Sequence, residues 1–274
     1  MDGFKDRVAI VTGGAAGIGR ALCEELGRRG AVVIVADINA EGARQVASAI
    51  AAAGDRAHAA HLDVSRAEQV QQLVATTTLE HGRLDYMFNN AGIGLVAELR
   101  DASLEHWRRI LDVNLWGVIY GATAAYQVMV KQGFGHIVNT SSAAGLLPAA
   151  LGTAYAASKH AVVGLSTSLR AEAAALGVKV SVVCPGLVRT NIWNAVTYVR
   201  VNPEAVKATV SSIKMSEAAD CARVILRGVA RNQAIIVVTP LARLSWWLYR
   251  LYPALYDLLV RKMVGDFRAL RSQA

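Results

Sequence analysis

Short apolar runs rich in β-branched residues alternate along this chain with longer segments in which apolar positions recur at helical spacing. The apolar runs predict seven strands, over 8–13, 32–37, 58–64, 84–92, 136–142, 178–186 and 234–240. The intervening segments predict helices over 18–29, 41–53, 66–81, 104–131, 155–176 and 217–231. Because the strands are apolar almost throughout and alternate with helices, we expect a parallel sheet with helices on both faces. Right-handed crossovers then make it a doubly wound α/β sheet in a single domain.

Two segments do not follow this alternation. Residues 187–216 mix apolar and polar positions, and residues 241–274 form a hydrophobic and basic extension after the last strand. Pro253 favours two shorter helices in that extension. On one continuous helix, four arginines would instead fall within about 20° of each other: Arg243, Arg250, Arg261 and Arg268. The mixture of Arg, Trp and Tyr over an apolar face suits a membrane interface. It also suits burial in an oligomer or over a pocket, which we favour.

Composition and charge narrow the class of protein. The 274 residues are 54% hydrophobic, with a mean hydropathy of +0.32 and no low-complexity tract, which indicates a compact globule. The formal net charge is +8, but Lys and Arg are scattered along the chain. Scattered cations argue against nucleic-acid binding, which needs a clustered patch, and are compatible with an anionic cofactor or an acidic carrier.

The cysteines, the histidines and the N-terminus indicate a cytoplasmic protein without a metal site. The three cysteines are widely spaced and form neither a disulfide framework nor a metal motif, and the histidines at 58, 61 and 136 have no ligand-like partners. The first residues run from charged positions directly into a strand, with no signal peptide. Residues 113–130 are uncharged but contain Asn, Gly, Thr and Gln, so we expect a buried interface helix and not a membrane span.

A glycine-rich turn follows the first predicted strand. TGGAAGIGRAL carries Gly13, Gly17 and Gly19 between this strand and the next helix, where backbone N–H groups can approach a pyrophosphate. Asp37 ends the second strand about twenty residues later, where a carboxylate can accept hydrogen bonds from both ribose hydroxyls. Asp37 could alternatively cap the helix over 39–53. Because its charge would repel a 2′-phosphate, NAD is favoured over NADP.

Two further strand ends add candidate cofactor contacts. Asp63 and Val64 could bracket an adenine, the carboxylate at its amino group and the apolar side chain at its face, or could be ordinary loop residues. The sequence NNAG at 89–92 ends the fourth strand, at the edge where ligands bind to parallel sheets, although Asn and Gly are also common in simple turns.

The segment TAYAASKHAVVG at 153–164 carries two large ionisable side chains, Tyr155 and Lys159, among small residues. They lie four positions apart and therefore share a helix face. Hydride transfer at a carbon that bears oxygen needs an acid or base near neutral pH, and the pKa of a free tyrosine is near 10. We expect Lys159 and an oxidised nicotinamide to lower the pKa of Tyr155.

Two polar residues elsewhere complete the candidate catalytic set. Ser142, at a strand end, could hold the substrate oxygen, while Ser141 should point the other way. Asn114 lies in an apolar helical stretch and could hold a water that relays protons, or could simply satisfy buried backbone groups.

Six sequence blocks in this order and spacing, TGGAAGIG, NNAG, LDVNLWG, NTSSAAG, YAASK and PGLVRT, resemble the short-chain dehydrogenase/reductase family over roughly residues 5–240. The resemblance implies a single-domain Rossmann-type fold over 1–240, with a variable substrate loop at 187–216 and the extension at 241–274. It implies homodimers or homotetramers formed through 104–131 and 155–176. It also implies the catalytic residues Asn114, Ser142, Tyr155 and Lys159.

The resemblance implies binding residues as well. The expected NAD contacts are Gly13, Ala16, Gly17, Ile18, Gly19, Asp37, Asp63, Val64, Asn90, Ala91, Gly92, Tyr155, Lys159, Pro185, Gly186, Val188 and Thr190. The expected substrate contacts are Ser142, Leu147, Tyr155 and Trp193.

Three functions follow from these patterns. The leading hypothesis is an NAD-dependent oxidoreductase that interconverts a secondary alcohol and a ketone on a hydrophobic small molecule, such as a steroid, terpenoid, lipid or cyclic alcohol. The second is an NADPH-dependent reductase of 3-oxoacyl groups on a carrier, which the net charge permits but Asp37 disfavours. The third is a non-catalytic dinucleotide-binding protein at a membrane surface, which the complete Asn-Ser-Tyr-Lys set disfavours.

Overall fold

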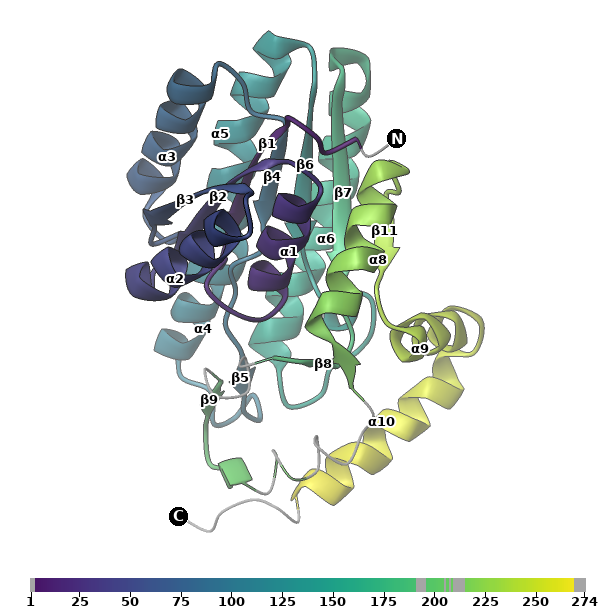
Figure 1. Ribbon diagram of the computed structural model, residues 1–274. Coiled ribbons are helices and arrows are strands. Elements are labelled where there is room, and N and C mark those ends of the chain that lie inside the picture. The colour runs from purple at the N-terminus through teal and green to yellow at the C-terminus, as the bar shows by residue number, and fades with distance from the viewer. Residues whose placement is uncertain (1–2, 191–195, 205, 207, 209–214, 269–274) are drawn as a thin grey trace.

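The computed structural model describes residues 3–190, 196–204, 206, 208 and 215–268, and its centre is a seven-stranded parallel sheet (Figure 1). The strand order is β11-β7-β6-β4-β1-β2-β3. The bounds are β1 Val8–Thr12, β2 Val32–Asp37, β3 Arg56–His61, β4 Tyr86–Asn89, β6 Gly135–Thr140, β7 Val178–Cys184 and β11 Ile235–Val237. The predicted seven-stranded parallel sheet is confirmed. The order reverses direction between β1 and β4, which is where doubly wound sheets bind ligands.

Helices cover both faces of the sheet because alternate strand residues point to opposite sides. On one face, Ala9 and Val11 of β1 pack in a buried cluster with α1 (Gly17–Arg28), α2 (Ala40–Ala52) and α8 (Ala218–Ala230). On the other face, Ile10 packs with α3 (Ala67–His81), α5 (Gly117–Gln132) and α6 (Thr153–Ala173). The near-continuous apolar strands of the sequence therefore mark burial on two sides.

The predicted helix over 104–131 is not continuous. It consists of α4 (Leu104–Leu111), a π-helical turn at Asp112–Trp116, and α5. π-Turns inside α-helices are frequent at functional sites, and this one contains Asn114. The helix prediction was right in extent and wrong about this irregular turn.

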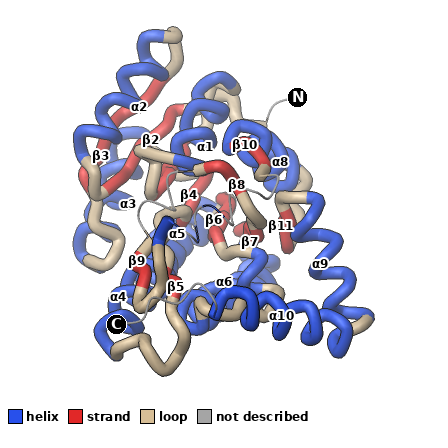
Figure 2. The backbone as a smooth tube through the Cα atoms, turned by 90° about the horizontal axis from the view of Figure 1, so that it is seen from below, coloured by secondary structure: helices blue, strands red, loops and turns tan. Residues whose placement is uncertain are grey.

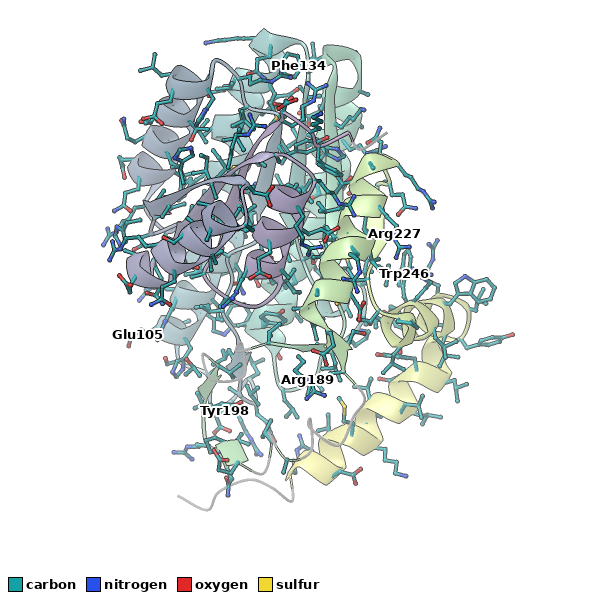
Figure 3. The ribbon with its side chains drawn as sticks, in the orientation of Figure 1. Glu105, Phe134, Arg189, Tyr198, Arg227 and Trp246 are labelled. Carbon is teal, nitrogen blue, oxygen red and sulfur yellow. The ribbon has the colours of Figure 1, made fainter. Side chains whose placement is uncertain are left out.

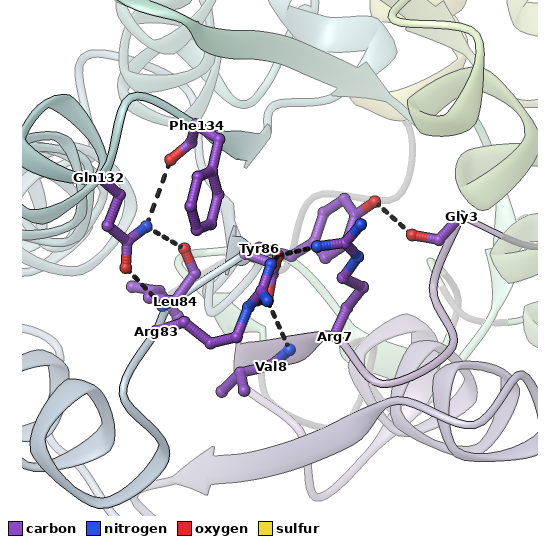
Figure 4. Close-up of polar contacts among 9 residues, drawn as sticks. Gly3, Arg7, Val8, Arg83, Leu84, Tyr86, Gln132 and Phe134 are labelled. Carbon is purple, nitrogen blue, oxygen red and sulfur yellow. Dashed lines mark hydrogen bonds and ion pairs between the residues drawn. The ribbon is translucent and has the colours of Figure 1, made fainter.

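At the edge of the sheet where the strands begin, several side chains make polar contacts with one another and with the backbone (Figure 4). The buried carboxylate of Asp85 accepts hydrogen bonds from Arg7 (3.1 Å), from Arg83 (2.6 and 2.7 Å) and from the backbone N–H of Val8 (2.9 Å). The side-chain amide of Gln132 accepts the N–H of Leu84 and donates to the carbonyls of Leu84 and Phe134. The opposite edge, where the strands end and which we call the carboxyl edge, carries the irregular segments.

Short strand pairs lie at the carboxyl edge. β5 (Leu95–Val96) pairs with β9 (Thr197–Tyr198), and β8 (Val188–Arg189) pairs with β10 (Ser216–Glu217), all in parallel register. Figure 3 places Arg189 and Tyr198 below the sheet, on this side of the molecule. The described strand residues of the predicted substrate loop thus lie at the carboxyl edge.

The C-terminal extension forms two helices, as Pro253 predicts. α9 (Pro240–Leu251) ends one residue before Tyr252, and α10 (Pro253–Arg268) starts at the proline, so the four arginines do not share one stripe. Both helices lie outside the body formed by the sheet and its flanking helices (Figures 1 and 2). Within the described ranges, no helix is both long and apolar enough to cross a bilayer.

Candidate active site at the carboxyl edge

The turn between β1 and α1 has a backbone that only glycine fits. Gly13 and Gly17 have positive φ angles of 66° and 55°. A Cβ on Gly19 would lie 2.0 Å from the carbonyl oxygen of Gly13. Ala16, at the start of α1, has no side-chain acceptor to cap the first N–H groups of the helix. These N–H groups and the positive end of the helix dipole therefore fit a pyrophosphate.

Asp37 is fixed beside this turn. Its Oδ2 accepts the backbone N–H of Ala15 at 3.0 Å, and its Oδ1 accepts that of Asn39 at 2.9 Å. Asn39 itself caps α2 by accepting the N–H of Gly42 at 3.0 Å. The alternative that Asp37 caps this helix is therefore wrong. Each carboxylate oxygen keeps a second lone pair, which fits the two hydroxyls of a ribose.

The segment NNAG is tied to the end of β1 by Thr12, a residue that the sequence reasoning missed. The Thr12 hydroxyl accepts the N–H groups of Asn90 (2.9 Å) and Ala91 (3.0 Å), and the Asn90 amide donates to the Thr12 carbonyl at 3.0 Å. Gly92 follows directly. A threonine immediately before the glycine turn was the available signal, because it ends the strand on which the turn is built.

In the structure, Asp63 is a loop residue and Val64 is a core residue. The Asp63 carboxylate accepts hydrogen bonds from the N–H (3.0 Å) and the hydroxyl (2.7 Å) of Ser65. Val64 is buried against Gly117, where an added Cβ would lie 2.9 Å from the Val64 side chain. The adenine contacts remain a prediction.

Tyr155 and Lys159 lie on one face of α6, as their spacing predicts. The Lys159 ammonium lies 5.7 Å from the centre of the Tyr155 ring and donates to the carbonyl of Thr140 at 3.1 Å. Lys159 is only 3% exposed, and its burial lowers the pKa to about 8. A positive charge is thus held under the phenol near neutral pH.

The two neighbouring serines point in different directions, as expected. Ser142 accepts the N–H of Ala144 at 3.2 Å, and its side chain lies close enough to the Tyr155 phenol to lower the pKa of that phenol. Ser141 is buried and donates to the backbone carbonyl of Lys159 at 2.7 Å. Burial raises the pKa of Tyr155 above its usual value, and the Ser142 side chain offsets only part of this rise. The lowering expected from Lys159 together with an oxidised nicotinamide stays a prediction.

Asn114, in the π-turn, is fully buried and holds the backbone beyond NNAG. Its Oδ1 accepts the N–H of Ile93 at 2.8 Å, and its Nδ2 donates to the Ile93 carbonyl at 3.0 Å. The interpretation that this asparagine satisfies buried backbone groups is therefore correct. A role in a proton relay stays a prediction.

The segment after β7 approaches the glycine turn. A Cβ on Gly17 would lie 3.1 Å from the Thr190 side chain, so the loops after β1 and β7 meet here. Pro185 and Gly186 directly follow Cys184, the last residue of β7, and Val188 begins β8. Of the two predicted apolar substrate contacts outside the catalytic set, Leu147 is buried and Trp193 lies outside the described residues.

A cavity of about 490 Å³ adjoins the start of α6 and was not predicted. Thr153, two residues before Tyr155, lines it together with Glu98, Leu99, Arg100, Ala150, Leu151, Val264 and Arg268. Arg268 of α10 pairs with Glu98 at 3.0 Å. The C-terminal extension therefore forms part of the wall of an open cavity at the start of α6, the helix that carries Tyr155 and Lys159.

Comparisons with known proteins agree with this geometry. A family model described as short chain dehydrogenase matches residues 7–200. Probable oxidoreductase EphD of Mycobacterium tuberculosis is 42% identical over 190 residues, which are 69% of this chain but only 32% of that protein. Cyclohexanol dehydrogenase of Acinetobacter sp. is 37% identical over 188 residues, 68% of this chain and 75% of the relative.

A solved structure extends the likeness over nearly the whole chain. A short-chain dehydrogenase/reductase from Burkholderia phymatum in complex with NAD has a TM-score of 0.85 and 30% sequence identity, and the match covers 93% of this chain and 96% of that one. The family match covers well over half of the present sequence. The protein therefore belongs to the short-chain dehydrogenase family.

Proposed function

We propose that this protein is an oxidoreductase that transfers a hydride between NAD and the oxygen-bearing carbon of a secondary alcohol or ketone. The observation that carries this proposal is the arrangement of Tyr155, which lies beside the Ser142 side chain and over the buried ammonium of Lys159. The group lies at the carboxyl edge that also holds the glycine turn and Asp37. NAD, when bound there, supplies the hydride acceptor or donor.

In this proposal the protein moves one proton. Tyr155 takes the hydroxyl proton during alcohol oxidation and returns it during ketone reduction. Ser142 donates a hydrogen bond to the substrate oxygen as negative charge develops on it. The Lys159 ammonium, 5.7 Å from the centre of the Tyr155 ring, favours the phenolate form of Tyr155 by its positive charge. The Ser142 side chain offsets part of the rise in the Tyr155 pKa that burial causes. Asn114 positions the segment beside them through Ile93.

The preference for NAD rests on Asp37. Its carboxylate is held by two backbone N–H groups at the place where a ribose would lie, and a 2′-phosphate would bring a second negative charge to it. The NAD-bound structural relative supports this choice. Reduction of carrier-bound 3-oxoacyl groups with NADPH is disfavoured for the same reason.

The proposed substrates are hydrophobic alcohols, cyclic ones first. The apolar part of the lining of the cavity beside α6 consists of Leu99, Ala150, Leu151 and Val264. A relative named cyclohexanol dehydrogenase supports the cyclic class. We also propose a homodimer or homotetramer through the outer side of α4 and α5, where Leu104 is exposed and Trp116 stacks on Tyr120 at 5.8 Å.

A panel of cyclic and other hydrophobic secondary alcohols, assayed for NADH formation, tests the proposal. Tyr155→Phe should bind NADH as tightly as the wild type and lose turnover by several orders of magnitude, because the phenyl ring keeps the packing and removes the exchangeable proton. Retained turnover in this variant, or no activity of the wild type on any alcohol or matching ketone in the panel, would refute the proposal.

A further inference from the structure

The C-terminal helices carry more than half of the exposed large hydrophobic side chains in the described part of the chain. Sixteen large hydrophobic side chains are exposed in the described part of the chain, and nine of them lie within residues 241–263. They are Leu241, Leu244, Trp247, Leu251, Tyr252, Leu255, Leu258, Leu259 and Met263. Patches of this kind on an otherwise ordinary surface indicate a binding partner. We call these nine residues the apolar C-terminal surface.

This surface is the outer side of two helices whose inner sides are already packed. In α9, Ala242 and Trp246 contact a buried cluster at β7 and β11. Leu244 and Trp247, 68% and 65% exposed, lie on the opposite side of the same helix. In α10, Val264 lines the cavity, whereas Leu258 is 63% exposed. The outer side of a surface helix is ordinarily polar, so the pattern here is reversed.

The charges around the apolar C-terminal surface are mostly positive. The cations of α9 and α10 are Arg243, Arg250, Arg261, Lys262 and Arg268, and the acids are Asp257 and Asp266. Arg261 pairs with Asp257, and Arg268 pairs with Glu98. Arg250 lies over the Trp246 ring at 5.4 Å, with its charge at the border of the apolar stripe.

This charge distribution distinguishes between partners. A two-fold contact with a second copy would place the same positive surface against itself, which is repulsive. A surface rich in phosphate carries the opposite charge, and long arginine side chains reach phosphates while Leu and Trp enter the acyl boundary. We propose that the apolar C-terminal surface docks in the plane of an anionic phospholipid bilayer.

The two helices are held in place for such docking. The rings of Tyr249 and Tyr256 meet edge to face at 5.4 Å across the break between α9 and α10. At the far end of α10, Arg268 pairs with Glu98 at 3.0 Å, in the segment that follows β5. Figures 1 and 2 show α10 on the side of the carboxyl edge. The bilayer would thus lie on the same side of the molecule as the carboxyl edge, with α10 between the lipid and the cavity beside α6.

The test uses the full chain and vesicles, with no substrate. Vesicles of phosphatidylcholine with phosphatidylglycerol should co-sediment the protein, vesicles of phosphatidylcholine alone should do so at least about tenfold more weakly, and added salt should weaken the binding. Trp247→Glu/Leu258→Glu should abolish sedimentation. The control Leu79→Glu, at an 86% exposed position on α3, should leave it unchanged. NADH binding and the melting temperature of each variant verify the fold.

A second pair of variants tests the charges. Arg250→Glu/Lys262→Glu should weaken binding to anionic vesicles about tenfold or more, whereas Arg44→Glu/Lys131→Glu, which reverses two charges on α2 and α5, should not. Three outcomes would overturn the proposal: no binding of the wild type to anionic vesicles, unchanged binding of the Trp247→Glu/Leu258→Glu variant, or conversion of an oligomer to a smaller species by that variant in light scattering. The last outcome would show that another copy of the chain covers this surface.

Discussion

The preference between NAD and NADP depends on one carboxylate, so Asp37→Asn is the most informative substitution. The change keeps the size of the side chain and removes its charge. In the structure both oxygens of Asp37 accept backbone N–H groups, from Ala15 and Asn39. Asparagine can accept only one of these bonds at a time, because its second terminal atom is a donor.

The size of the effect follows from the position of Asp37 at the surface. Two unit charges about 4 Å apart interact by about 1 kcal/mol in water and about 4 kcal/mol near a protein surface. For a partly exposed carboxylate and a nearly doubly charged 2′-phosphate we take about 2 kcal/mol, which is about 30-fold in Kd. A ribose hydroxyl that loses a charged acceptor weakens NADH binding by about 1.4 kcal/mol, or about tenfold. The ratio of the two dissociation constants should therefore move about 300-fold toward NADPH.

Fluorescence titration of NADH and NADPH against the wild type and Asp37→Asn measures this ratio. Glu41→Gln is the matched control, because it removes an exposed carboxylate on α2 that pairs with Arg44. The control should leave the ratio within about twofold of the wild type. If the wild type binds both dinucleotides equally, or if Asp37→Asn moves the ratio by less than about threefold, Asp37 only ties the glycine turn to β2 and the reasoning is wrong.

Three other predictions concern catalysis, acid stability and packing. Ser142→Ala should lower turnover about 100-fold or more without changing the free energy of unfolding. Ser141→Ala should lower the free energy of unfolding by about 1–3 kcal/mol and leave turnover nearly unchanged, because the Ser141 hydroxyl donates to a buried carbonyl at 2.7 Å. Burial lowers the pKa of His136 to about 3. As the pH falls below about 6.5, the imidazole of His136 is protonated in the unfolded chain before it is protonated in the folded protein. The free energy of unfolding should therefore be about 2 kcal/mol lower at pH 5 than above pH 6.5, and His136→Gln should remove this loss from urea unfolding curves. Gly121→Ala should destabilise the protein by about 1–3 kcal/mol, because the new Cβ would lie 1.9 Å from the buried Oδ1 of Asn89. Gly164→Ala should stabilise the protein by about 0.5–1 kcal/mol, because the space around this position of α6 is open.

Each of these predictions has an outcome that contradicts it. Equal loss of turnover in both serine variants would mean that the two hydroxyls act together. An unchanged pH dependence after the loss of His136 would place the acid sensitivity in other groups. Equal melting temperatures of the two glycine variants would show that the space around Gly121 can relax.

Much of the fold was predictable because its signals are local. The apolar runs at β1, β2 and β7 are buried on both sides of the sheet, and burial of that kind requires the β-branched residues that the sequence displays. The pairing of Tyr155 with Lys159 on one face also follows from helix geometry alone. The break at Pro253 follows from the chemistry of one residue.

The errors and omissions involve contacts between distant segments. The π-turn contains Asn114, whose side-chain amide bonds to the N–H and the carbonyl of Ile93, twenty-one positions away in the sequence. Thr12 gains its importance from the N–H groups of the two residues after β4, and its place before the glycine turn is only an indirect signal of these contacts. The burial that raises the pKa of Tyr155 comes from the surrounding segments, and the spacing of Tyr155 and Lys159 gives no sign of it.

The alternation of strands and helices, the glycine turn and the residue types of the candidate site can be read from the amino-acid sequence, because each depends on backbone preferences or on spacing within one element. The position of the C-terminal extension depends on contacts that form only in the folded chain. The pair between Arg268 and Glu98 joins segments 170 residues apart and brings Val264 to the cavity beside Thr153. Such a contact has no local signature, because ion pairs and apolar walls form between whichever side chains the folded chain brings together.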